Sequence, residues 1–155
     1  NDPYVIEFNC RFGDPETQPI MMRLKGSMVD LITLGLDGNL PKQTEWDARP
    51  ALGVVLASKG YPESASNGDV IHGLPTLESQ YGQTDIDVKV FHAGTKASDN
   101  GEIVTNGGRV VCVTALGDDI LDAQTKALAV CGAISFDGMQ YRRDIGWRAI
   151  QSSAE

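Results

Sequence analysis

The spacing of the apolar residues changes near residue 50, and this change limits the possible folds more than any other feature of the sequence. Upstream, helical spacing connects Ile20, Met21, Leu24, Met28, Leu31, Ile32 and Gly35. We therefore expect one amphipathic helix of about six turns that ends near Gly38. From Ala51 onward, the apolar residues fall into short runs and alternations that are typical of strands. This order predicts an α+β fold with a polar connector at residues 37–50.

The downstream part is predicted to be a β-rich unit closed by a helix. Strands are expected within 51–58, 69–74 and 86–94. The pair Asn106–Gly107 in "EIVTNGGRVVCVTALG" predicts a hairpin, because Asn-Gly is a strong signal for a two-residue turn. Helical spacing in 118–134 predicts a helix with Asp119 as its N-cap. We expect the tail "YRRDIGWRAI" to pack through Trp147 and Ile150 with its arginines outside.

The composition excludes some classes of protein. The 155 residues carry a formal net charge of −8, which argues against nucleic acid or an anionic membrane as the main partner. No apolar run approaches the roughly 20 residues of a membrane span. The three cysteines, Cys10, Cys112 and Cys131, form no Cys-x-x-Cys pair, so we expect reduced, buried thiols in a cytoplasmic protein.

The N-terminal stretch "VIEFNCRFGDPETQP" concentrates polar side chains behind a short apolar run. We expect a strand at Val5–Phe8, and alternate residues of a strand point to one face, so Glu7, Asn9 and Arg11 would lie together. A turn with Asp14 and Glu16 follows. A lone strand at the start of a chain without an initiator Met has no local partner. We therefore expect residues 1–45 to be the end of a mostly missing domain, and 46–155 to form a unit with its own core.

Each of these polar residues has a functional and a structural interpretation. Glu7 and Asn9 offer oxygen ligands for Mg²⁺, although spacing alone favours the polar side of a half-exposed strand. Arg11 suits a carboxylate or phosphate, or an ion pair with Asp14 or Glu16. Asp14 is more typical of a helix cap than of a catalytic group. Glu16 either reaches the site or favours the helix N-terminus through its charge.

Other candidate sites are weaker. The sequence "NGGR" at 106–109 lacks the Lys-Ser/Thr and the helix of a phosphate loop, so a hairpin turn is favoured. His72 and His92, without clustered cysteines, argue against a zinc site and fit core or turn positions. Lys59 follows a predicted strand in a turn, from which it could project into a cleft.

The exact residues of several short motifs are more informative about function than the spacing of residue types. "RFGDPETQ" at 11–18 resembles the signature of the phosphoribosylamine–glycine ligase family, also called glycinamide ribonucleotide synthetases. "GVVLASKGYP", "GDVIHGL", "VFHAGT", "TNGGRVVCVTALG" and "RRDIGWRAI" are similar to the same family in the same order. The resemblance covers nearly the whole chain.

This resemblance implies an ATP-grasp enzyme of purine biosynthesis. ATP would phosphorylate glycine, and the amine of 5-phosphoribosylamine would attack the acyl phosphate to give glycinamide ribonucleotide, ADP and phosphate. Glu7 and Asn9 match the metal positions of the family and would hold Mg²⁺ or Mn²⁺ against ATP. Arg11 would orient the acyl phosphate or a substrate anion. Asp14 and Glu16 would receive the amine or shape the turn.

The resemblance also implies an architecture. Residues 1–45 would be the last strand and helix of an ATP-grasp core, and 46–155 a barrel-like or sandwich-like C-terminal domain with a packed helix, related to that of biotin carboxylase. Lys59 and Arg109 are the residues we expect to face the substrate cleft. The nucleotide-binding lysines and glycine-rich loop would lie upstream, so this chain alone is expected to be inactive.

Two other functions remain open at this stage. A self-contained binding or assembly module would pair and bury the strand Val5–Phe8 within the chain itself. Another ATP-grasp enzyme, such as a carboxylase, would share "E-x-N-x-R" but not "RFGDPETQ".

Overall fold

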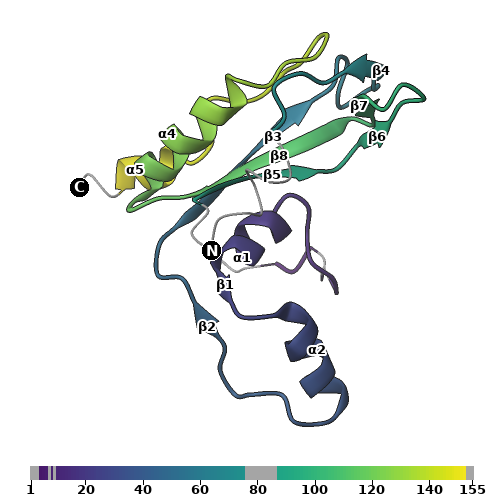
Figure 1. Ribbon diagram of the computed structural model, residues 1–155. Coiled ribbons are helices and arrows are strands. Elements are labelled where there is room, and N and C mark those ends of the chain that lie inside the picture. The colour runs from purple at the N-terminus through teal and green to yellow at the C-terminus, as the bar shows by residue number, and fades with distance from the viewer. Residues whose placement is uncertain (1–3, 7, 9, 76–86, 153–155) are drawn as a thin grey trace.

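The computed structural model describes residues 4–6, 8, 10–75 and 87–152 (Figure 1). A β-rich unit carries α4 on one side and α1 on the other, and α2 projects away from it at the far end of the N-terminal part. The helices are α1 Thr17–Arg23, α2 Met28–Leu36, α4 Ile120–Cys131 and α5 Trp147–Ser152. The strands are β1 Leu24–Lys25, β2 Glu45–Trp46, β3 Ala51–Ala57, β4 Asn67–Val70, β5 Val88–His92, β6 Thr95–Ala97, β7 Ile103–Asn106 and β8 Arg109–Leu116. The predicted α+β class is confirmed.

The strands of the β-rich unit form two open, three-stranded antiparallel sheets. Their orders are β3-β8-β5 and β4-β7-β6. The described strands therefore do not close into the barrel that was one of the two predicted forms.

The predicted hairpin at Asn106–Gly107 is wrong, because β7 and β8 belong to different sheets. The hairpin turn lies one Asn-Gly pair earlier, where Ser98 and Glu102 close the loop between β6 and β7 by a backbone bond of 2.8 Å. At Asn106–Gly108 the chain instead passes from one sheet into the other. This crossing is tight, since a Cβ on Gly94 would lie 2.9 Å from Gly107 Cα.

The core lies between α4 and the sheet that contains β8. Leu52, Val54 and Leu56 alternate along β3 as buried residues of this core. Small residues of α4, Ala123 and Ala127, are fully buried and let the helix approach the sheet closely. The predicted N-cap is confirmed, since Asp119 accepts a bond from the Asp122 amide over 2.7 Å.

The long helix predicted to end near Gly38 is wrong, because the chain breaks it after Arg23. Gly26 adopts φ +105°, a left-handed conformation that suits glycine. Ser27 then caps a second helix by accepting from the Asp30 amide over 3.2 Å. Within the predicted connector, Trp46 pairs with Leu24 in a short two-stranded sheet.

The strand predicted at Val5–Phe8 is also absent from the described residues of that segment, 4–6 and 8. Ile6 is 96% exposed and Phe8 82% exposed. A strand needs a partner for its backbone groups, and none of the described strands pairs with this segment. A self-contained module required this strand to be paired and buried, so the observation counts against that function.

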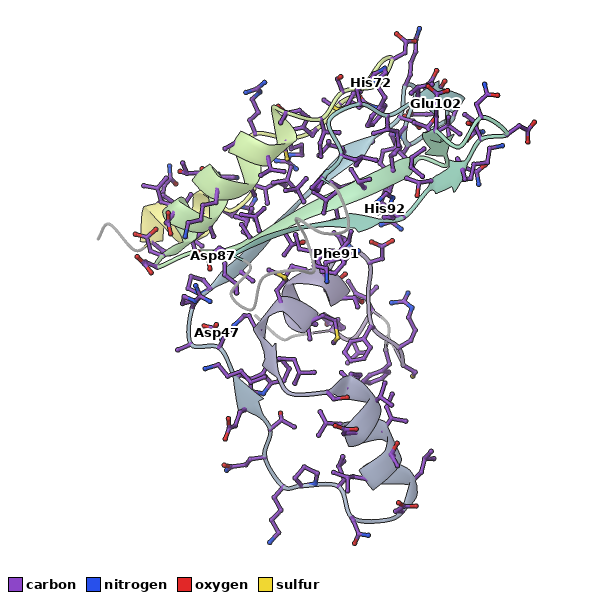
Figure 2. All side chains as sticks on the ribbon, in the orientation of Figure 1. Asp47, His72, Asp87, Phe91, His92 and Glu102 are labelled. Atoms are coloured by element: carbon purple, nitrogen blue, oxygen red, sulfur yellow. The ribbon has the colours of Figure 1, made fainter. Side chains whose placement is uncertain are left out.

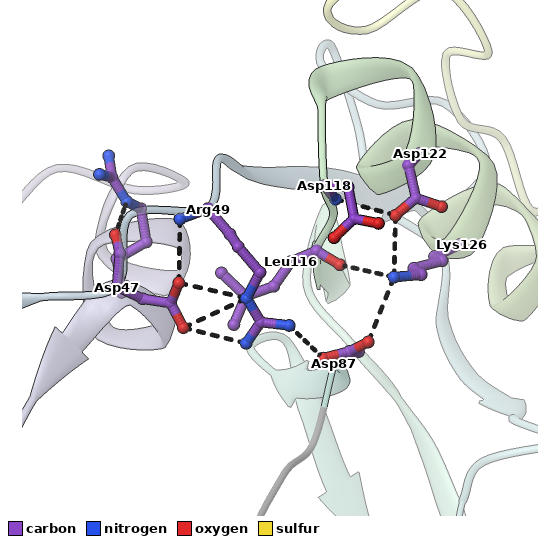
Figure 3. Close-up of polar contacts among 8 residues, drawn as sticks. Asp47, Arg49, Asp87, Leu116, Asp118, Asp122 and Lys126 are labelled. Carbon is purple, nitrogen blue, oxygen red and sulfur yellow. Dashed lines mark hydrogen bonds and ion pairs between the residues drawn. The ribbon is translucent and has the colours of Figure 1, made fainter.

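A polar network ties the residues before β3 to the β-rich unit (Figure 3). Arg49 donates to Asp47 and to Asp87, and Lys126 donates to Asp87 and Asp122. We call Asp47, Arg49, Asp87, Lys126 and Asp122 the Arg49 network. Asp47 also exchanges backbone and side-chain bonds with Arg23 at the end of α1. The end of α1 is therefore fixed to the sheet.

The C-terminal tail packs differently from its prediction. Trp147 is 43% exposed, with Arg148 stacked over its ring, so its predicted packing role is wrong. Tyr141 and Ile145 pack against the core instead. The arginines lie outside as predicted, with Arg142 paired to Asp144 at 2.7 Å.

Candidate functional site

The signature "RFGDPETQ" forms the turn before α1 and the first residues of that helix. Thr17 donates its amide to the Gly13 carbonyl over 3.0 Å, which closes the turn. Glu16 occupies the N-cap position, but the described chain contains no capping bond from its side chain. Its carboxylate folds back over Gly13, where a Cβ would collide with both carboxylate oxygens. The absence of a side chain at Gly13 therefore leaves room for the Glu16 carboxylate, which forms no capping bond in the described chain, beside the turn.

The sequence predicted that Asp14 caps the helix, but the structure places Asp14 outside the N-cap position. Its carbonyl accepts from Arg109 Nη1 over 2.8 Å, and its Oδ2 pairs with Arg109 Nη2 at 3.2 Å. Arg109 opens β8, so one of the two residues expected to face the cleft instead contacts the signature turn directly. Gln18 approaches Asp14 Oδ1 at 3.5 Å, the limit of a hydrogen bond.

Arg11 is exposed, and Nη1 lies 3.4 Å from the Phe12 carbonyl. Its alternative interpretation, an ion pair with Asp14 or Glu16, is not formed within the described part of the chain. An exposed guanidinium beside a turn rich in carboxylates can bind an oxyanion by two parallel bonds. Glu7 and Asn9, the predicted metal ligands, lie outside the described residues.

Helix α1 lies over the face of the sheet opposite α4 (Figure 1). Cys112 and Thr114 of β8 and Gly53 of β3 form this face, and a Cβ on Gly53 would touch the Pro19 ring at 3.4 Å. Burial raises the pKa of the Cys112 thiol, and the nearby negative charge of Asp14 raises it further. The thiol is thus a neutral packing group rather than a nucleophile.

A pocket of about 370 Å³ begins at Pro15 of the signature turn and runs along β3. Its walls are mainly apolar, and it is bordered by Tyr61, Gln140, Tyr141 and Arg142. Gln140 fixes one wall, because its amide donates to the carbonyls of Ser58 and Tyr61. Sequence reasoning missed these residues as a pocket wall. It singled out only the tail that contains Tyr141 and Arg142, and for packing rather than for a site.

Lys59 is exposed in the loop after β3. Its stem lies against Gly138, where a Cβ would collide with it. Within the described chain it makes no polar side-chain contact with the signature turn, so Arg109 and Asp14 are brought together while Lys59 stays separate.

The described residues contain no group of three or more His, Cys, Asp or Glu side chains arranged to hold a metal ion. His72 and His92 are exposed and lie well apart (Figure 2). His92 Nδ1 instead bonds Thr95 Oγ1 at 3.1 Å. In the same described part of the chain, every helix is too short or too polar to cross a bilayer.

Known proteins resemble this chain closely. Residues 51–148 match the family model "Phosphoribosylglycinamide synthetase, C domain". The phosphoribosylamine–glycine ligase of Salmonella typhimurium is 56% identical over 151 residues, which cover 97% of this chain and 34% of the relative. The same enzyme of Escherichia coli K12 is 54% identical over 151 residues, with the same coverage.

A solved structure of an enzyme with the same name is also similar to this chain. The phosphoribosylamine–glycine ligase of Thermotoga maritima superposes with a TM-score of 0.73 and 34% identity, over 93% of this chain and 34% of that one. The chain therefore spans about a third of the length of the curated relatives it matches.

Proposed function

Because this chain belongs to the phosphoribosylglycinamide synthetase family and matches its C domain, we propose that it acts as the C-terminal part of an ATP-dependent phosphoribosylamine–glycine ligase. The observation that carries the proposal is the docking of "RFGDPETQ" on the β8 sheet through Arg109 and Asp14. The two relatives described above are 56% and 54% identical to this chain over 151 residues, which cover 97% of it.

The proposed reaction joins glycine to 5-phosphoribosylamine in two steps. ATP transfers its γ-phosphoryl group to the glycine carboxylate and leaves as ADP. The amine then forms the C–N bond as the C–O bond to phosphate breaks, and the amine loses a proton. The product is glycinamide ribonucleotide, and we place the reaction in the cytoplasm, which the three free cysteines support.

The residues of the turn have distinct proposed roles. Arg11 would orient the acyl phosphate through charge-assisted bonds. Glu16, whose carboxylate is not used as a cap, would receive the incoming amine. Asp14 would shape the turn, since its carbonyl and carboxylate are both engaged. Lys59 is proposed to contribute a positive charge at the cleft.

Glu7 and Asn9 would hold Mg²⁺ or Mn²⁺. Their donor atoms, a carboxylate and an amide oxygen, suit a hard cation. When bound, such an ion neutralises charge on the phosphates during phosphoryl transfer.

The domain arrangement is likewise proposed. The family match begins at residue 51, which supports a C-terminal domain at 46–155. Residues 1–45 would be the end of an ATP-grasp domain. Most of the exposed large hydrophobic side chains fall in this segment, as expected for a surface that the upstream domain covers.

The test is ADP release by the complete ligase chain, with glycine and 5-phosphoribosylamine supplied together and each omitted in turn. We expect turnover only with both substrates, and none from residues 1–155 alone. Glu7→Ala in the complete chain should lower the rate strongly, because the metal would lose a charged ligand. A complete chain that releases no ADP with both substrates would overturn the proposal.

A further inference from the structure

Arg109 is the described side chain of the β-rich unit that bonds the signature turn. Its two terminal nitrogens engage two different acceptors of one residue, the carbonyl and the carboxylate of Asp14. The two residues lie 95 positions apart. This geometry fixes both the position of the turn and its orientation, because a guanidinium is planar and its donors diverge at set angles.

The backbone of Arg109 is itself held rigidly. Its carbonyl accepts from the Gly94 amide over 2.8 Å at the crossing between the two sheets. The next two residues of β8, Val110 and Val111, are both 0% exposed. Because its backbone is anchored beside the core, Arg109 can hold the signature turn in a fixed place relative to the core.

The turn has few other ties at this end of α1. Gly13 is held by bonds from Thr17, within the same turn. The opposite end of the helix is fixed separately, by the bonds between Arg23 and Asp47. Without Arg109, this end of α1 would be held to the sheet by packing on β3 and β8, where Pro19 lies over Gly53.

We propose that Arg109 is a positioning residue, which sets the place of Arg11 and Glu16 by clamping Asp14 to the β8 sheet. This inference rests on the proposed function for its catalytic consequence, but its structural part can be tested without it. Arg109 acts through Asp14, because both terminal nitrogens are already used on that residue.

The first test is hydrogen exchange on the 155-residue chain. Arg109→Met keeps the apolar stem and removes the guanidinium. The amides of Thr17 and Ile20, in the first turn of α1, should exchange about three- to tenfold faster, as expected for loss of a part-exposed ion pair. Amides of Val111 and Val113 should keep their protection, which shows that the sheet stays folded. The matched control is Arg148→Met, an exposed arginine of α5 that, among the described residues, does not contact the signature turn.

The second test is kinetic and uses the complete ligase chain. A misplaced turn should lower kcat by about 10²-fold while KM for ATP changes little. Arg109→Lys should recover part of kcat, since an ammonium can bond one of the two acceptors. If Arg109 only stabilised the fold, Arg109→Met would reduce the folded fraction of the enzyme. In samples of equal folded content its kcat would then match wild type, and Arg109→Lys would have no loss of kcat to recover.

The outcomes separate the two proposals. Unchanged exchange at Thr17 and Ile20 in Arg109→Met would overturn the positioning role, whatever the enzyme does. Faster exchange at these amides supports the positioning role. If ADP release nevertheless proves independent of glycine, the proposed ligase function is overturned while the positioning role stands. Full activity of Arg109→Met in a glycine-dependent ligase would also overturn the positioning role.

Discussion

Arg49 donates to Asp87 over 2.7 Å, so a residue two positions before β3 is tied to the residue just before β5. The same guanidinium holds Asp47 at 2.9 Å. Lys126 of α4 reaches Asp87 from the other side at 3.2 Å (Figure 3). Two cations therefore share one carboxylate where linker, sheet and helix meet.

This network should make stability depend on pH in the acid range. Hydrogen bonds from Arg49 lower the pKa of Asp47 from 3.8 to about 2, and bonds from Arg49 and Lys126 lower the pKa of Asp87. A carboxylate with a lowered pKa stabilises the fold above its unfolded pKa, and this contribution is lost as pH falls through the folded value. The relevant window therefore runs from 3.8 down to about 2.

Arg49→Met should lower Tm at neutral pH, and the difference from wild type should shrink as pH falls through that window. Thermal unfolding followed by circular dichroism at a series of pH values measures this. Arg148→Met, outside the network, is the control and should show no such convergence. A Tm difference that stays constant down to about pH 2 would contradict this account.

Local signals in the sequence predicted local structure well. The Asp119 cap and the α4 spacing were correct because each depends on residues a few positions apart. The break at Gly26 had a signal too, since Ser27 and Asp30 have the spacing of a cap and its first turn. The helical spacing of apolar residues from Ile20 to Gly35 continues across this break, so the sequence predicted one helix instead of two.

Non-local structure could not be predicted in the same way. Two Asn-Gly pairs, at 100–101 and 106–107, fit a hairpin equally well, and only the sheet partners of β7 and β8 decide between them. A strand at Val5–Phe8 depends on a partner that no local pattern specifies. The contact between Arg109 and Asp14 joins residues 95 positions apart, so no local pattern could predict it.

Gly94 should be intolerant of a side chain. A Cβ there would lie 2.8 Å from the Arg109 carbonyl oxygen and 2.9 Å from Gly107 Cα, both backbone atoms. Gly94→Ala should therefore lower the free energy of unfolding by about 1–3 kcal/mol, the usual cost of overpacking. Urea unfolding measures the change.

Gly132→Ala is the matched control for this substitution. Gly132 has φ −69°, and its Cβ would lie 3.5 Å from the Ala129 carbonyl oxygen, an ordinary contact. The control should be neutral or stabilising by up to about 1 kcal/mol. Equal effects of the two substitutions would show that the crossing between the sheets is looser than the contacts indicate.

The three thiols should react at very different rates in the folded chain. Cys10 is exposed, whereas Cys112 and Cys131 are buried, which corrects the prediction of three buried thiols. Burial raises the pKa of Cys131 to about 12, so only about one part in 10⁴ is thiolate at about pH 8. Iodoacetamide labelling followed by mass spectrometry should modify Cys10 first. Labelling of Cys131 as fast as Cys10 under native conditions would refute its burial.

The cap of α4 gives a quantitative check on the core. Asp119 accepts from the Asp122 amide over 2.7 Å, and Asp119→Ala leaves that amide without its partner. The expected loss is about 1 kcal/mol in the free energy of unfolding, within a range of about 0.5–2 kcal/mol. Asp118→Ala removes an adjacent carboxylate of the same charge, so urea unfolding of both variants separates the hydrogen bond from the helix-terminus charge. Equal losses would assign the effect to charge alone, whereas a larger loss for Asp119→Ala would assign it to the cap that starts α4 against the β8 sheet.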